Sequence, residues 1–261
     1  MVGMQARVNF QYRTGFALSM IIFPFVLIVN VMLFESIYAY SGADQIKGYS
    51  LTQMIWYFAA LPFVWVFIYN NTPYRLSQRI LRGELTTDFL KPMSIFHIEL
   101  AFSVGQRFVA MVIEFFPTLF IYMAIYFPDF LTVASFCKFV LVALFSFALM
   151  FLLGFLIGMA AFGVKSVRAL DDLKGGALGL LGGGLIPLDF MPDNVRKVVD
   201  VLPFKYVFYE PLQFFLNNPA KAGWKPLLET IGMQLVWIGA LYAIVRTIWS
   251  VAARRFCAAG G

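Results

Sequence analysis

Apolar segments alternate with short polar ones along most of the chain. Five apolar segments are long, and they cover about residues 16–38, 51–71, 98–127, 137–162 and 227–251. A helix needs about 20 residues, at a rise of 1.5 Å each, to cross a hydrocarbon core of ~30 Å. A sixth segment, 170–190, combines a polar start with the glycine-rich run GGALGLLGGG and is just long enough. The pattern therefore predicts six membrane-spanning helices.

The composition agrees with a membrane protein rather than a soluble one. Hydrophobic residues make up 61% of the 261 residues and charged residues 13%, and the mean hydropathy is +0.79. Soluble domains have about 25% charged residues. Strand-like alternation is absent from the sequence, and a lipid-exposed backbone must then be helical. We expect a single all-α integral membrane domain over residues 1–261.

Lysine and arginine residues give the expected orientation. Only Lys47 and Lys138 lie in the short loops on one side. The other side holds Arg7, Arg13, Arg75, Arg79, Arg82, Lys91, Lys165, Arg168, Lys174, Arg246, Arg254 and Arg255. The positive-inside rule places that side, and both termini, in the cytoplasm. The net charge of +6 is then explained by anionic lipid headgroups, so we expect lipid contact and no nucleic acid partner.

The polar segment 75–92, after the second predicted span, combines both signs of charge. Arg75, Arg79 and Arg82 recur at helical spacings, and Glu84 and Asp88 follow at i, i+4. One interpretation is an amphipathic helix lying on lipid headgroups. The other is a helix that docks a cytoplasmic protein. The residues by themselves favour neither.

A deep carboxylate is the main polar feature within the predicted spans. Glu114 lies about midway along the third span, with Arg107 two helical turns before it and Pro117 three residues after it. A carboxylate at that depth faces a bundle interior or water rather than lipid. Glu114 is therefore predicted to make an interhelical hydrogen bond or ion pair, or to line a substrate path; a proton relay is a third, weaker interpretation.

The region after the glycine-rich run contains five prolines. They divide residues 187–219 into pieces too short to cross a membrane, yet the pieces are rich in valine, phenylalanine and tyrosine. Short amphipathic helices on the outer face, over about 191–219, fit this pattern. The glycines of LGLLGGGL permit either close helix packing or a flexible helix.

Catalytic chemistry is poorly represented. The sequence has no G-x-x-x-x-G-K-[ST] phosphate loop, so we expect the chain to bind no cofactor and to hydrolyse no ATP. Its single histidine, His97, lies at the edge of the third span and is a weak candidate for membrane acyltransferase chemistry. No metal-ligand spacing is present in the sequence.

Several segments together resemble the permease subunits of ABC-2-type exporters, in particular the branch described as ABC-2 family transporter protein. They are FQYRTGF, ESIYAYSGADQIKGYSLTQMIWY, ILRGELTTDFLKPMS, GFLIGMAAFGV and GGGLIPLDFMP followed by LPFKYVFYEP. Their order and spacing, over nearly the whole chain, carry the resemblance.

The resemblance implies a bacterial inner-membrane permease that pairs with a second permease, identical or related. It implies a separate ATP-binding cassette ATPase, carrying ATP and Mg²⁺, docked on the element 75–92. That favours docking for Arg75, Arg79, Arg82, Glu84 and Asp88. The outer region would then hold re-entrant helices at an exit gate, for which Leu188, Phe190 and Met191 are candidates. An ion-coupled carrier is the alternative, and a membrane enzyme or scaffold is less favoured.

Overall fold

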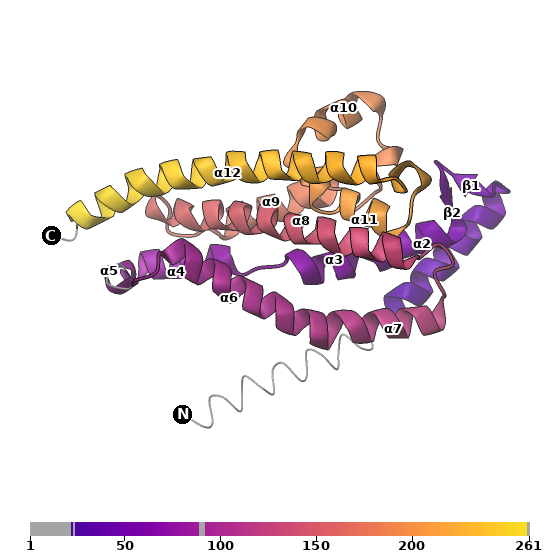
Figure 1. Ribbon diagram of the computed structural model, residues 1–261, viewed down its shortest axis with the longest axis horizontal. Coiled ribbons are helices and arrows are strands. Elements are labelled where there is room, and N and C mark those ends of the chain that lie inside the picture. The colour runs from indigo at the N-terminus through magenta and orange to yellow at the C-terminus, as the bar shows by residue number, and fades with distance from the viewer. Residues whose placement is uncertain (1–21, 23, 89–91, 260–261) are drawn as a thin grey trace, which may run out of the picture.

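A computed structural model describes residues 22, 24–88 and 92–259, and the chain forms an elongated helical bundle (Figure 1). The N-terminal helix is Pro24–Ser41. The later elements are β1 (Gln45–Ile46), β2 (Tyr49–Ser50), α2 (Leu51–Ala59), α3 (Leu61–Ile68), α4 (Thr72–Leu81), α5 (Leu85–Asp88), α6 (Ile95–Ala110), the π-helix η1 (Met111–Phe115), α7 (Phe116–Ile125), α8 (Val133–Met159), η2 (Ala160–Phe162), α9 (Arg168–Leu181), η3 (Leu188–Phe190), α10 (Asp193–Val201), η4 (Pro203–Tyr206), α11 (Tyr209–Phe215), η5 (Pro219–Lys221) and α12 (Trp224–Ala259).

Five helical stretches are long and apolar enough to cross a membrane. They are Pro24–Ser41, Leu51–Leu81, Ile95–Ile125, Val133–Phe162 and Trp224–Ala252. They correspond to the five long apolar segments of the sequence, although residues 16–21 and 23 of the first segment lie outside the described residues. The chain is an all-α integral membrane protein, as predicted.

The sixth predicted span is shorter than expected. Helix α9 has 14 residues and ends at Leu181 rather than at residue 190. At 1.5 Å per residue it extends about 21 Å, less than the ~30 Å of a hydrocarbon core. Its backbone turns at Gly182 and Gly183, where Gly183 has a positive φ of 82°. A sixth crossing therefore stays a prediction.

The proline-rich region forms short helices, as the sequence indicates, but their positions differ from one another. Helix α10 projects from the side of the bundle (Figure 1). Helix α11 lies inside it: all seven of its residues are buried, and it packs on α8. The apolar side chains of α11 are thus part of the core rather than of an outer surface.

A small hairpin joins the N-terminal helix to α2. Strands β1 and β2 pair antiparallel, and the two turn residues, Lys47 and Gly48, both have positive φ. This is the backbone of a type I′ turn, whose twist matches that of the strands. Ser50 then caps α2 in a reciprocal capping box with Gln53. The short loop between the first two predicted spans, which contains Lys47, is therefore an ordered element.

Aromatic side chains fill the centre of the bundle around α8. Phe139 of α8 lies 5.3 Å from Phe215 of α11, and Phe63 of α3 lies 5.3 Å from Phe115 of η1, measured between ring centroids. Trp56 is fully buried beside them. Edge-to-face contacts of this kind add to the stabilisation from burial. The interior of one chain is therefore packed.

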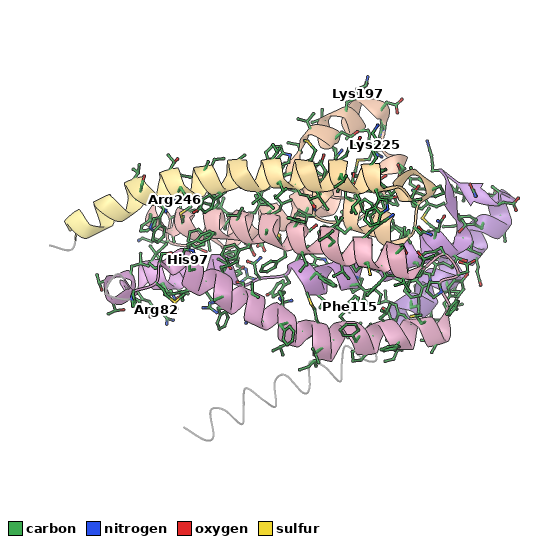
Figure 2. The ribbon with its side chains drawn as sticks, in the orientation of Figure 1. Arg82, His97, Phe115, Lys197, Lys225 and Arg246 are labelled. Carbon is green, nitrogen blue, oxygen red and sulfur yellow. The ribbon has the colours of Figure 1, made fainter. Side chains whose placement is uncertain are left out.

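The two ends of the bundle differ in charge. Arg82, His97 and Arg246 gather at one end (Figure 2), which we call the basic end. The opposite end carries β1 and β2 (Figure 1), and we call it the hairpin end.

Candidate functional site

Two arginines of α4 point toward α6 at the basic end. The Nε atom of Arg75 lies 3.2 Å from one carboxylate oxygen of Glu99, and the Nε atom of Arg79 lies 3.4 Å from the other. The side chain of Glu99 is fully buried, whereas the arginines are about one-fifth exposed. A buried carboxylate needs such partners because an unpaired charge is costly away from water. Glu99 was missed by the sequence analysis.

The remaining predicted docking residues face outward. Arg82 and Glu84 are exposed, with 3.9 Å between Nη1 and Oε1. Gly83 separates them with a positive φ of 71°, which ends α4. The side chain of Asp88 and residues 89–91 lie outside the described part of the chain. The predicted set thus divides into an inward pair, Arg75 and Arg79, and an outward pair, Arg82 and Glu84.

Helix α4 sits on α8 at two glycines. A Cβ atom on Gly158 would approach Leu76 Cβ to 2.9 Å, and one on Gly154 would approach Asn70 Oδ1 to 2.8 Å. Real Cβ atoms do not come this close, so Gly158 must be glycine for α4 to pack on α8, and Gly154 must be glycine for α8 to pack on Asn70, just before α4. Leu76 is fully buried there. Tight packing of this kind leaves little room for α4 to move without α8.

Arg107 and Glu114 occupy one groove on the third long helix. Their groove, about 460 Å³ in volume, is formed by α6 and η1 and also contains Gln106. Arg107 donates through Nη1 to the carbonyl oxygen of Val66 over 3.0 Å. Glu114 is half-buried. The sequence predicted either a structural or a path-lining role, and the groove is compatible with both.

A π-helical turn holds Glu114. Phe116 donates its N–H to the carbonyl of Met111, and the next residue, Pro117, has no N–H to donate. Over Met111–Phe115 the backbone hydrogen bond therefore spans five residues instead of four, which makes this turn of the helix wider. Such π-helical turns are rare in proteins, and those that occur are often found at functional sites.

The glycine-rich run is a point of close packing. Tyr57 donates its hydroxyl to the carbonyl of Gly183 over 2.7 Å, and Tyr209 donates its N–H to the carbonyl of Gly182 over 2.9 Å. A Cβ atom on Gly183 would lie 2.7 Å from the Tyr57 hydroxyl oxygen. Of the two interpretations of LGLLGGGL, the structure supports close packing at these positions.

The three candidate gate residues do not share one environment. Leu188 is fully buried within the chain, beside Gly183. Met191 is half-buried, and Phe190 is 38% exposed. Phe190 also lines a small apolar groove, about 160 Å³ in volume, together with Phe34 and Tyr38. Their role at a gate stays a prediction, and Phe190 is the best placed of the three.

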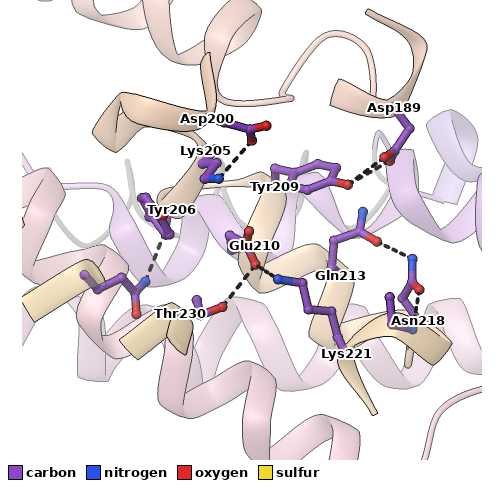
Figure 3. Close-up of polar contacts among 12 residues, drawn as sticks. Asp189, Asp200, Lys205, Tyr206, Tyr209, Glu210, Gln213, Asn218, Lys221 and Thr230 are labelled. Carbon is purple, nitrogen blue, oxygen red and sulfur yellow. Dashed lines mark hydrogen bonds and ion pairs between the residues drawn. The ribbon is translucent and has the colours of Figure 1, made fainter. Parts of the chain in front are cut away.

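A polar cluster at the hairpin end joins β2 to three elements that follow one another much later in the chain, η3, α10 and α11. Asp189 accepts from the hydroxyls of Tyr49 and Tyr209, at 2.5 and 2.8 Å (Figure 3 shows Asp189 and Tyr209). Arg196 of α10 lies 3.0 Å from the same carboxylate. Gln213 of α11 donates to the Tyr49 hydroxyl over 2.6 Å. We call Tyr49, Asp189, Arg196, Tyr209 and Gln213 the tyrosine–aspartate cluster.

Tyr49 keeps its proton within this cluster. Burial, the neighbouring Tyr209 and the carboxylate of Asp189 together raise the pKa of the Tyr49 hydroxyl well above its usual range. The hydroxyl therefore remains a donor to Asp189 at any physiological pH.

Two further polar groups tie α11 and η4 to α12 (Figure 3). Glu210 pairs with Lys221 at 2.6 Å and accepts from Thr230 at 3.2 Å. Gln234 donates to the carbonyl oxygen of Tyr206 and to the hydroxyl of Ser146 on α8, both over 3.1 Å. Buried polar groups linked in this way hold short segments in one arrangement.

His97 lies at the start of α6, where its Nδ1 is 2.6 Å from the hydroxyl of Ser94. Within the described residues, no group of three or more histidine, cysteine or acidic side chains could hold a metal ion.

The comparisons with known proteins agree with this architecture. A family model described as ABC-2 family transporter protein matches residues 25–260. No curated protein and no solved structure matches the chain. Since the family model covers nearly the whole chain, the protein belongs to the ABC-2 transporter family and is a membrane permease of an ABC transporter.

Proposed function

We propose that this permease forms half of the translocation path of an ATP-driven exporter and docks a separate ATPase subunit through α4 and α5. Proteins of its family work with ATPase subunits. The observation that carries the proposal is the exposed pair Arg82 and Glu84, which directly follows a helix that is fixed to the bundle by Glu99 and by the glycines of α8. A docking element must transmit force, and this one has rigid supports on two sides.

In this proposal the path runs along a face of the chain. Aromatic side chains such as Trp56, Phe63 and Phe139 fill the centre, so substrate has no open route there. A second permease, identical or related, would complete the path. Family membership favours this account over an ion-coupled carrier or a membrane enzyme.

Direction and orientation complete the proposal. Outward transport rests on the resemblance to ABC-2 exporters. The excess of arginine at the basic end supports a cytoplasmic position for that end, in a bacterial inner membrane, with both termini cytoplasmic and an exit near the hairpin end. ATP and Mg²⁺ would bind the partner ATPase rather than this chain.

Co-purification in mild detergent tests the docking step. The Arg82→Glu variant should lose its ATPase subunit while its level in the membrane stays unchanged, because Arg82 is exposed and its only described ion pair is the weak one with Glu84. Lys225→Glu is the matched control: it reverses an exposed charge at the hairpin end, in a comparable pair with Glu229. Equal recovery of the ATPase with both variants would contradict docking at α4 and α5.

A further inference from the structure

A second polar site lies at the basic end, between the start of α6, α8 and α12. Its pocket is about 70 Å³ in volume and is lined by Ser94, His97, Phe155, Tyr242, Arg246 and Trp249. Figure 2 shows His97 and Arg246 at the same end of the bundle. None of these residues belongs to the outward pair of the proposed docking element or to the groove with Glu114.

Arg246 brings a positive charge to this pocket without a matching acid. The arginines of α4 and Arg196 each pair with a carboxylate. Arg246, in contrast, forms no ion pair or hydrogen bond with any side chain that the structure describes. An exposed guanidinium near the end of a spanning stretch, with no partner among the described side chains, is suited to a phosphate because its planar fork matches two phosphate oxygens.

His97 adds a second donor. Its Nδ1 lies 2.6 Å from the Ser94 hydroxyl. When that hydroxyl donates to Nδ1, the neutral ring carries its proton on Nε2, from which it can donate to an anion. His97 is also the third residue of α6, a helix of 16 residues. The first turn of a helix favours a nearby negative charge.

The depth of the pocket fits a lipid headgroup. The apolar stretch that contains α6 begins at Ile95, and the one that contains most of α12 ends at Ala252. The pocket residues of α6 lie next to Ile95, and those of α12 lie shortly before Ala252. The pocket is therefore at the level where both helices leave the hydrocarbon core. Tyr242 and Trp249 form its walls, and such aromatic residues are enriched at the level of the headgroups.

We propose that this pocket binds the phosphodiester group of an anionic phospholipid, with Arg246 and His97 as donors to the phosphate oxygens. A pocket of about 70 Å³ is too small for a whole lipid, so only the phosphate group would enter it and the rest of the lipid would lie outside. Free inorganic phosphate has the same recognised chemistry, and the test below separates the two sources.

Thermal unfolding of the purified protein in detergent is the measurement, with phosphatidylglycerol, phosphatidylcholine and inorganic phosphate added separately. Phosphatidylglycerol should raise the unfolding midpoint of the wild type, and inorganic phosphate should not. Arg246→Gln and His97→Ala should each weaken the apparent affinity for phosphatidylglycerol about tenfold, the value of one lost charge-assisted hydrogen bond. Arg246→Lys keeps the charge but loses the planar fork, so its response should fall between those of the wild type and Arg246→Gln.

Arg168→Gln is the control, since it removes an exposed charge at the start of α9, outside the pocket and outside the proposed docking element, and should leave the response unchanged. An identical phosphatidylglycerol response in the wild type and in Arg246→Gln would overturn the site. A midpoint raised by inorganic phosphate alone, and lost in Arg246→Gln, would assign the site to free phosphate and overturn the lipid. If Arg246→Gln does not fold, His97→Ala decides: a phosphatidylglycerol response identical to that of the wild type would overturn the site.

Discussion

The basic end and the hairpin end are held together by different means. At the basic end, long helices pack closely, and a single buried carboxylate, Glu99, joins two arginines of α4 to α6. At the hairpin end, helices of three to nine residues are connected by loops, and neutral hydroxyls share the Asp189 carboxylate. The first arrangement suits helices that move together as one rigid unit. The second suits several short helices that are each held by a few hydrogen bonds.

The largest expected effect is at Glu99. Glu99→Gln leaves two arginines beside a neutral amide, and we expect a loss of about 3 kcal/mol in the free energy of unfolding. The partial exposure of the arginines places the loss at the lower end of the usual range. Chemical unfolding followed by tryptophan fluorescence measures it. Glu84→Gln, in the exposed pair with Arg82, should change stability by less than about 0.5 kcal/mol; similar losses for both variants would refute the assigned rigidity.

Gly183 tests the packing at the hairpin end. Gly183→Ala places a Cβ atom against the Tyr57 hydroxyl at a positive φ, and we expect a loss of about 2 kcal/mol from strain and overpacking. Gly48→Ala is the matched control, because Gly48 also has a positive φ but nothing within 4 Å of the added atom. Gly48→Ala should lose less, about 1 kcal/mol. Equal losses would mean that the close contact with Tyr57 contributes nothing.

Tyr49 should have the smallest effect of the three. Tyr49→Phe removes the hydroxyl that donates to Asp189 and accepts from Gln213. We expect the free energy of unfolding to fall by about 1–2 kcal/mol. The raised pKa of Tyr49 means that its contribution is present below pH 10 and is lost only as the pH rises through the higher folded-state value. The difference in stability from the wild type should therefore be constant between pH 6 and 9, whereas Tyr40→Phe, at a 96% exposed position, should change nothing. A difference that falls across this pH range would contradict the assigned donor.

The sequence predicts the long helices well because each depends on a local property, the length of an apolar run. Pro117 is likewise visible in the sequence, and its missing N–H acts on its own helix, beside the π-helical turn. It misses Glu99, whose partners lie 20 and 24 residues earlier on another helix. It misses the tyrosine–aspartate cluster for the same reason, because Tyr49 and Asp189 are 140 residues apart.

The sequence places α11 at the surface for a different reason. Its prolines and short length indicate a short amphipathic helix on the outer face, but periodicity over seven residues cannot show that every face is buried. The end of α9 at Leu181 is a related case: composition alone counts Leu185 and Ile186 as part of an apolar run, whereas the contacts of Gly182 and Gly183 with Tyr209 and Tyr57 end the helix before them.

Photo-cross-linking of the assembled transporter tests the central claim most directly, namely that the ATPase contacts the basic end through α4 and α5. A photoreactive amino acid replaces Thr86, which is exposed on α5, or Tyr40, which is exposed at the hairpin end. The account predicts an adduct with the ATPase subunit from position 86 and none from position 40. An ATPase adduct from position 40, or its absence from position 86 in a complex that still hydrolyses ATP, would contradict it.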